Sequence, residues 1–142
     1  MEIATCYLTS VAGSPYSPSR MHQVPKKHAK ESPAEYEERT WVEKGHFLDS
    51  GEMYIPANCF KECLGYAAKM LSLKIPGKGN KLYTSHFVSG VQIADNGIGL
   101  GLTRKEILAN PEKYSVSLFQ NADGKKGSGK RVMRTFPLIP GW

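Results

Sequence analysis

The sequence predicts an α+β fold in which a mixed or antiparallel sheet carries one main amphipathic helix on one face. The strongest signal is a helical hydrophobic pattern over residues 56–73. A second signal is the strand-like alternation of "KYSVSLFQ" at residues 113–120. With 142 residues and 40% hydrophobic content, the chain has enough apolar material for one core. We therefore predict a single domain over residues 1–142.

The N-terminal part reads as a strand followed by an arm. β-Branched and aromatic residues in "IATCYLTSVAG" predict a strand over residues 3–11 that ends before Gly13. Residues 14–31 contain three prolines and several serines, which is typical of an extended loop. This arm carries Tyr16 and Arg20, together with Lys26, Lys27 and Lys30.

A short helix is predicted to follow the arm. Ser32 suits the N-cap, Pro33 the first helical position, and Glu35 completes the spacing of a capping box. Glu35 and Arg39 are spaced i, i+4, so we expect them to form a salt bridge on a solvated face. The helix is expected to end within residues 41–44.

The clearest helix spans residues 56–73, with Pro56 in its first turn. Its predicted buried face combines residues spaced i, i+4, i+7, i+8 and i+11 with four flanking ones: Phe60, Leu64, Ala67, Ala68 and Leu71, then Cys59, Cys63, Tyr66 and Met70. The opposite face is formed by Lys61, Glu62, Gly65, Lys69 and Ser72. The pattern predicts that the apolar face packs on a sheet or on another helix.

The remaining elements are shorter. A Gly-Pro loop over residues 74–81 precedes "LYTSHFVSGVQIAD", which reads as a strand with a kink or bulge at Gly90. "NGIGLG" is expected to be a glycine-rich connection, and Thr103 to cap a helix that ends before Pro111. The last strands are predicted over "KYSVSLFQ" and "RVMRTF", before two prolines end the second one.

Charge and composition favour an intracellular protein with a polyanionic partner. The formal net charge is +6, which favours nucleic acid over an acidic or neutral partner. Three cysteines are an odd number and too few for a secreted disulfide scaffold, so we expect a cytoplasmic location. Neither a secretory signal nor an apolar run of about 20 residues is found, so we expect no membrane partner.

The basic, glycine-rich loop at residues 122–131 is open to three interpretations. Gly124, Gly129 and Lys130 satisfy the spacing of a phosphate-binding Walker loop. Arg131 follows where that loop needs a hydroxyl for magnesium, and a strand follows where it needs a helix. The other interpretations are a solvated hairpin tip and a contact to a phosphate backbone. The second acid-free basic loop, at residues 74–81, favours the last of these, because two such loops could form one surface.

The favoured function is therefore non-enzymatic binding of RNA or single-stranded nucleic acid. The candidate binding residues are Lys74, Lys78, Lys81, Lys125, Lys126, Lys130, Arg131, Arg134, Arg20 and Tyr16. Tyr16 is included because an aromatic ring in a polar loop can stack on a base.

No metal site, cofactor or catalytic group is expected. Cys59 and Cys63 share a helix face but lack the further ligands of a zinc site, so they are interpreted as core residues. The four histidines are scattered. A cysteine-dependent or nucleotide-dependent enzyme is the third hypothesis, after nucleic-acid binding and protein binding.

At "GEMYIPANCFKECLGYAAKML" the chain resembles the superfamily of repeat-associated (RAMP-like) CRISPR proteins, the subunits that coat guide RNA. Its first helix follows a similar motif, carried here by Tyr54 to Ala57, Asn58, Phe60 and Lys61. The chain is also similar to uncharacterised phage and mobile-element proteins, through Tyr16 to Arg20, Tyr36 to Trp41 and Ile75 to Gly79.

This resemblance implies a ferredoxin-like, RNA-recognition-type sheet of order βαββαβ with RNA along its basic loops and arm. Members of the superfamily continue into a second half, whereas this sequence stops at Trp142, so the sheet is expected to be incomplete. Either the short segments of this chain complete the sheet in another way, or its open edge is completed by another chain, because an open sheet edge is a template for docking. The alternative function is therefore that of an anti-CRISPR inhibitor, which docks on a CRISPR effector complex or another host protein.

Overall fold

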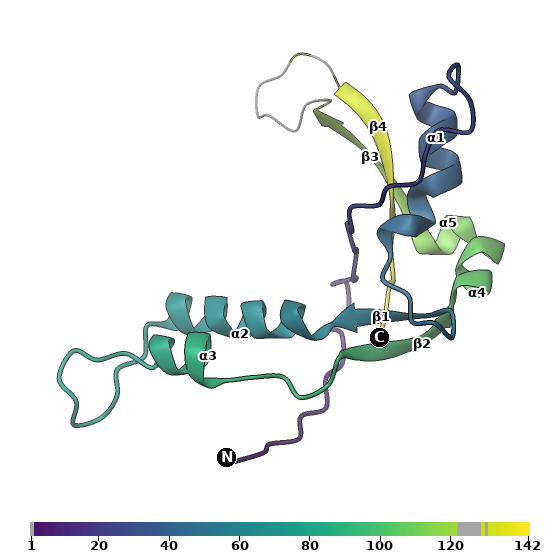
Figure 1. Ribbon diagram of the computed structural model, residues 1–142. Helices are drawn as coiled ribbons and strands as arrows, with labels where there is room; N and C mark the ends of the chain where they lie inside the picture. Colours follow the sequence, from purple (N-terminus) through teal and green to yellow (C-terminus); the bar gives the residue numbers. More distant parts are fainter. Residues whose placement is uncertain (1, 122–128, 130) are drawn as a thin grey trace. The chain divides into compact units, whose positions relative to one another are not determined.

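The computed structural model describes residues 2–121, 129 and 131–142, and it confirms the α+β class. The described strands form two antiparallel two-stranded pairings, β1 with β2 and β3 with β4. The ferredoxin-like expectation placed the strands in one sheet, whereas these strands lie in two. By its contacts the chain divides into two compact units, Met1–Met53 with Gly101–Trp142, and Tyr54–Leu100. Figure 1 shows the helices and strands of both.

The first unit begins its regular structure with α1 (Pro33–Thr40), which continues directly into the 3₁₀ helix η1 (Trp41–Lys44). The predicted capping box is present: the hydroxyl of Ser32 accepts from the Glu35 N–H, and the Glu35 carboxylate accepts from the Ser32 N–H. Glu35 is therefore engaged at the cap, and the expected Glu35–Arg39 bridge is wrong. Arg39 instead donates to Glu31, from both Nε and one terminal nitrogen.

The β3–β4 hairpin lies beside α1 in this unit (Figure 1). β3 (Ser115–Asn121) and β4 (Arg131–Pro137) pair in a register that joins Ser117 to Thr135 and Asn121 to Arg131. Both strands were predicted, because the alternation of apolar and polar residues is a local signal. The core beneath them consists of side chains from all parts of the unit: Trp41, Val42, Met53, Ile107, Tyr114, Phe136 and Ile139.

Two strands connect the units. β1 (Glu52–Pro56) pairs with β2 (Gly97–Thr103), and each strand begins in one unit and ends in the other. The expectation that "NGIGLG" is only a connection is wrong. Position 97 of this strand requires glycine, because a Cβ there would lie 2.3 Å from the Tyr54 ring.

Two short helices follow β2. The Thr103 cap was predicted and is present, as a second capping box with Glu106 at the start of α4 (Arg104–Ala109). α4 ends before Pro111, as predicted, and Pro111 begins a further turn, α5 (Pro111–Tyr114).

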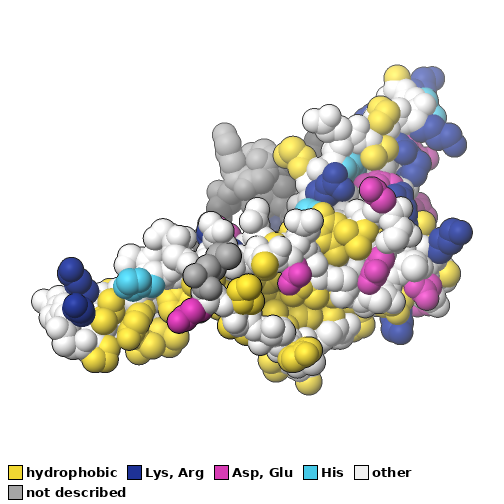
Figure 2. Space-filling view, turned by 60° about the horizontal axis from the view of Figure 1, so that its bottom comes forward, with side chains coloured by type: hydrophobic (Ala, Val, Ile, Leu, Met, Phe, Trp, Pro, Cys, Tyr) yellow, Lys and Arg dark blue, Asp and Glu magenta, His cyan; other side chains and the backbone are white. Residues whose placement is uncertain are grey.

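The second unit contains α2 (Ala57–Leu71) and α3 (Thr84–Gly90), which pack against each other. α2 was predicted almost to the residue, but its buried face was not. The one buried residue of the helix is Gly65, which had been assigned to the polar side. The apolar side is exposed, and Figure 2 shows hydrophobic side chains on the surface of these two helices.

Two predicted strands are absent. Residues 3–11 form no strand. Near the end of this segment, the Ser10 N–H donates to the carbonyl of Trp142 at 2.8 Å. α3 replaces the strand predicted over residues 82–95, because its contact with α2 overrides the β-propensity of its residues. The Thr84 hydroxyl donates to the Ala68 carbonyl at 3.2 Å and fixes this contact.

The arm of residues 14–31 is held along the first unit by backbone and side-chain hydrogen bonds. Tyr16 forms an isolated bridge with Ile139, and the Ser17 hydroxyl donates to the Pro137 carbonyl at 2.8 Å. Further along, the Arg20 N–H donates to the Lys44 carbonyl at 2.9 Å. None of the helices within the described ranges has both the length and the apolar character that crossing a bilayer requires.

Candidate nucleic-acid interface

The ten candidate binding residues divide between the two units. Lys74, Lys78 and Lys81 belong to the second unit, and Tyr16, Arg20, Arg131 and Arg134 to the first. Lys125, Lys126 and Lys130 lie outside the described residues.

The basic loop of the second unit is a tight turn that presents its lysines to solvent. An isolated bridge between Lys74 and Leu82 closes the loop, and Gly77 has a positive φ of 72° that suits glycine in the turn. Lys78 and Lys81 are exposed. The Lys74 ammonium donates to the Asn80 side chain at 3.3 Å. The loop thus supplies cationic groups with no carboxylate among its own residues.

Arg134 differs from the other candidates because a buried carboxylate balances its charge. Its guanidinium donates to Glu37 at 3.1 Å, and the same carboxylate accepts from the Lys44 ammonium at 2.5 Å and from the Thr135 N–H at 3.2 Å. Burial opposes ionisation of Glu37, yet these hydrogen bonds and the charges of Lys44 and Arg134 hold its pKa below the ordinary value. Arg134 therefore stabilises the fold and is the weakest of the described candidates for a phosphate contact.

The two arm candidates are fixed through their backbones. Tyr16 is half-buried, and its N–H donates to the Ile139 carbonyl at 2.9 Å, so its ring is less open to stacking than the sequence suggested. The Arg20 side chain is exposed. Burial and the positive charge of Arg20 lower the pKa of the neighbouring His46. Arg20 therefore adds positive charge near His46 on the first unit.

The clearest candidate site lies at the end of the β3–β4 hairpin. Phe119, Gln120, Asn121 and Arg131 line an open hollow of about 400 Å³ there. The Phe119 ring is 66% exposed, although an aromatic side chain of this size is usually buried. An exposed aromatic ring, two carboxamides and a guanidinium are the groups that bind unpaired nucleotides, by stacking, hydrogen bonding and phosphate pairing.

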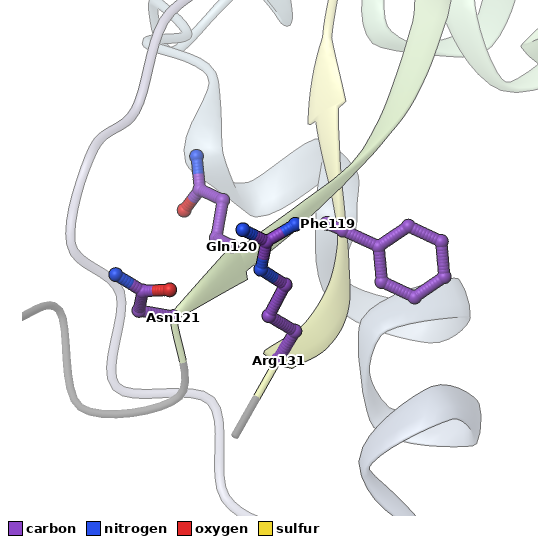
Figure 3. A pocket seen from close by; sticks show the side chains of 4 residues that line it. All are labelled: Phe119, Gln120, Asn121 and Arg131. Carbon is purple, nitrogen blue, oxygen red and sulfur yellow. The ribbon is translucent and has the colours of Figure 1, made fainter. Parts of the chain in front are cut away.

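The strand register decides which of these side chains share a face. Phe119 pairs with Met133, and Asn121 with Arg131, so these four project from one face of the hairpin, while Gln120 projects from the other. In Figure 3 the Phe119 ring points away from the two carboxamides, and the Arg131 guanidinium is drawn between them. The hairpin end therefore offers separate groups for a base and for a phosphate along one short path.

Phe119 was missed as a candidate, although the sequence contains a signal for it. In the alternation of this strand, Val116 and Leu118 hold the apolar positions, and Phe119 shares the phase of Ser115, Ser117 and Asn121. An aromatic residue in the polar phase of a half-buried strand is predicted to face solvent. Arg131, by contrast, was proposed from the sequence and lines the hollow.

Cys59 and Cys63 were interpreted as core residues, and this is wrong: both are exposed, as is Cys6. The two helical cysteines are exposed because α2 presents their face outward. Among the described residues, no three histidine, cysteine or acidic side chains come together in a way that could hold a metal ion.

Comparisons with known proteins leave the family open. The chain matches no family model, no curated protein and no solved structure. The resemblance to repeat-associated CRISPR proteins therefore stays a prediction.

Proposed function

We propose that this protein binds RNA or single-stranded nucleic acid, without catalysis, through the end of the β3–β4 hairpin. The observation that carries the proposal is the exposed Phe119 ring on the same hairpin face as the Arg131 side chain. Stacking on an aromatic ring is tolerant of base identity and contributes about 1–3 kcal/mol per base. A guanidinium adds phosphate binding that weakens with salt.

The charge of the chain supports the same proposal. The net charge is +6, and the segment that joins the two strands contains Lys125, Lys126 and Lys130, whose structure lies outside the described residues. A cationic segment that follows the stacking group closely in the sequence would increase the rate and strength of association with a polyanion. Arg20 and the lysine loop of residues 74–81 stay secondary candidates.

The test is fluorescence anisotropy with a labelled 12-nucleotide oligouridine, and with oligothymidine of the same length, at two salt concentrations. Phe119→Ala is expected to weaken binding about tenfold at both salt concentrations, because stacking is not electrostatic. Arg131→Gln is expected to weaken binding mainly at low salt and to reduce the salt slope by about 0.7, as the loss of one phosphate contact to a single strand requires.

Matched controls separate the site from general effects. Leu118→Ala removes an exposed apolar side chain from the other face of the same strand, and Lys105→Gln removes an exposed charge from α4. Both controls are expected to bind like the unmodified protein. The proposal is refuted if the Phe119 and Arg131 variants bind the oligonucleotides with the same affinity as the unmodified protein.

A second candidate function, protein binding as an inhibitor, is favoured by the free edge of β3. The Thr135 N–H and C=O bond outward to Glu37 and Lys44, so the Ser117–Thr135 pair is one whose backbone groups point away from the partner strand. The alternation then turns the backbone groups of Ser117 and Phe119 outward too, and in the described part of the chain no residue outside the hairpin bonds to them. Such an edge can accept a strand from another chain.

This candidate is tested with a purified multi-subunit CRISPR effector complex as the probe. Ser117→Pro removes an outward N–H, whereas Ser117→Ala keeps it and serves as the control. The inhibitor hypothesis expects the complex to bind the unmodified protein and the alanine variant, but not the proline variant. Binding that is equal for all three proteins, or absent for all, counts against the hypothesis.

A further inference from the structure

We infer that the exposed apolar face of α2 is a docking surface for an acidic protein partner. This face, called the α2 apolar face below, consists of Cys59, Cys63, Tyr66, Ala67, Met70 and Leu71. The inference goes beyond the proposed function, because this surface belongs to the second unit and the hairpin to the first. Binding of a protein here and binding of nucleic acid at the hairpin can succeed or fail separately.

α2 packs against α3 through the face that carries Gly65 and Ala68, and the α2 apolar face has no neighbour among the described elements. Gly65 is buried against α3, and a Cβ at its position would lie 3.6 Å from Val88. The Ala68 carbonyl accepts a hydrogen bond from the Thr84 hydroxyl of α3. With 100° of rotation per residue, the α2 apolar face lies on the other side of the helix from this contact.

The exposure of this face is large for apolar side chains. Tyr66 is 67% exposed, Met70 72% and Leu71 65%. They do not stand singly, because residues spaced three and four apart are neighbours on a helix surface. Within the second unit, Ile55 and Gly65 are the only residues that are buried. A contiguous apolar surface on a unit with so small a core is typical of an element completed by a partner.

The surface also has a shape into which a partner's side chain could fit. An open hollow of about 470 Å³ is lined by Cys59, Glu62, Cys63, Tyr66 and Ala67. Its apolar lining suits an inserted aliphatic or aromatic side chain, the kind of anchor that dominates protein interfaces. Methionine and cysteine beside it are soft groups that adapt to a partner's surface.

Charge identifies the kind of partner. The second unit contains five lysines and two acidic residues, Glu62 and Asp95, so its formal charge is +3. Lys69 lies on α2 beside the apolar face, and the loop with Lys74, Lys78 and Lys81 adjoins the C-terminal end of the helix. Figure 2 shows dark blue lysine or arginine side chains next to the yellow surface of this unit. An apolar stripe flanked by aspartate and glutamate is complementary to this arrangement.

Two other occupants fit less well. A second copy of the chain would set lysines against lysines around the same apolar stripe. A membrane surface fits less well because a flat bilayer does not fill a hollow.

The experiment uses the full chain and a pair of designed helical peptides. Both peptides carry the same leucine stripe, flanked by glutamates in one and by lysines in the other. Anisotropy is expected to show that the glutamate peptide binds at least about tenfold more tightly. Met70→Glu is expected to weaken that binding at least about tenfold, since it places a charge in the contact. Met21→Glu changes an exposed methionine of the arm, 91% exposed against 72% for Met70; it is the matched control and should bind like the unmodified protein.

Each other outcome overturns the inference. Equal binding of the two peptides would show that charge does not select the partner. Equal binding of the glutamate peptide by the two methionine variants would show that the α2 apolar face is not the binding surface. A dimer in sedimentation velocity that Met70→Glu dissociates would make the occupant a second copy. Binding to phosphatidylglycerol vesicles that depends on Met70, with no binding of the glutamate peptide, would make it a membrane. Circular dichroism of both variants confirms that the helices remain.

Discussion

Replacing Glu37 by alanine is the most informative perturbation of this fold. The Glu37 carboxylate is buried and accepts three hydrogen bonds, from Lys44, Arg134 and the Thr135 N–H. Lys44 is buried as well, and its ammonium also donates to the Thr135 carbonyl and lies 4.4 Å from the centre of the Phe136 ring. The pair therefore satisfies the backbone of β4 where another strand would otherwise be needed.

The expected loss of stability follows from what remains after the substitution. Breaking a buried ion pair from one side costs about 3–5 kcal/mol, because an uncompensated charge stays in the interior. Lys44 keeps its bond to Thr135 and its place over Phe136, so the lower end applies, about 3 kcal/mol. Lys44→Met is expected to cost less, about 2 kcal/mol, because Glu37 keeps Arg134 and the Thr135 N–H. The double variant is expected to lose at least about 1 kcal/mol less than the sum of both.

Urea unfolding followed by the fluorescence of buried Trp41 measures these free energies. Glu37→Gln keeps an acceptor for the Thr135 N–H while removing the charge, and Glu38→Gln changes an exposed neighbour by the same chemistry. The glutamine variant at 37 is expected to lie between alanine and the unmodified protein, and the one at 38 within about 0.5 kcal/mol of the latter. Losses at 37 and 44 that simply add would refute the coupled network.

The pH dependence gives an independent readout of the same carboxylate. The pKa of Glu37 is lower in the folded protein than its ordinary value of 4.5. Its contribution to stability is therefore present above pH 4.5 and is lost as the pH falls through the folded pKa. Glu37→Gln removes this contribution. The difference in free energy of unfolding between the unmodified protein and the Glu37→Gln variant should therefore become smaller as the pH falls.

Three further predictions concern other parts of the fold. Ile107 is fully buried, so Ile107→Ala should lower the free energy of unfolding by about 3 kcal/mol in the same urea assay. Gly97→Ala would place a Cβ 2.3 Å from Tyr54 and 3.0 Å from the Ile55 carbonyl, so thermal unfolding should begin at a lower temperature, and an unchanged midpoint would contradict this packing. The side-chain bond from Arg39, opposed by desolvation, lowers the Glu31 pKa to about 2. Glu31→Gln should therefore reduce the loss of stability that is expected between pH 4.5 and 2, while the share due to Glu37 remains.

Local signals in the sequence were sufficient for the helix starts and for the hairpin. Ser32 and Thr103 each precede a glutamate by three residues, and both capping boxes form. Capping depends on hydrogen bonds within four residues, so the neighbouring residues contain all the information it needs. The alternation of β3 is local in the same way. Arg131 was proposed from the positive charge of the glycine-rich segment, which is also a local signal, and it lines the hollow at the hairpin end.

Partners distant in the sequence account for the corrections. Thr84, Phe87 and Val88 of α3 favour a strand, but contact with α2 decided for a helix. Arg39 had a carboxylate one turn before it, yet Glu35 was engaged by the cap and Glu31 was reached from the arm. Ile3 and Tyr7 belong to the segment that was predicted as a strand, and both are exposed. β-Propensity alone does not form a strand, because a strand also needs the edge of a neighbouring strand to pair with.

The sequence by itself determined the α+β class, the extents of α1, α2 and the hairpin, and the positive charge of the chain, because each follows from residues close together or from composition. The tertiary structure alone decided which side of α2 is buried and which carboxylate holds Arg134. Periodicity identifies an apolar side of a helix, but only the neighbouring elements decide whether anything covers it. The two surfaces proposed for binding are places where the described fold leaves apolar groups uncovered.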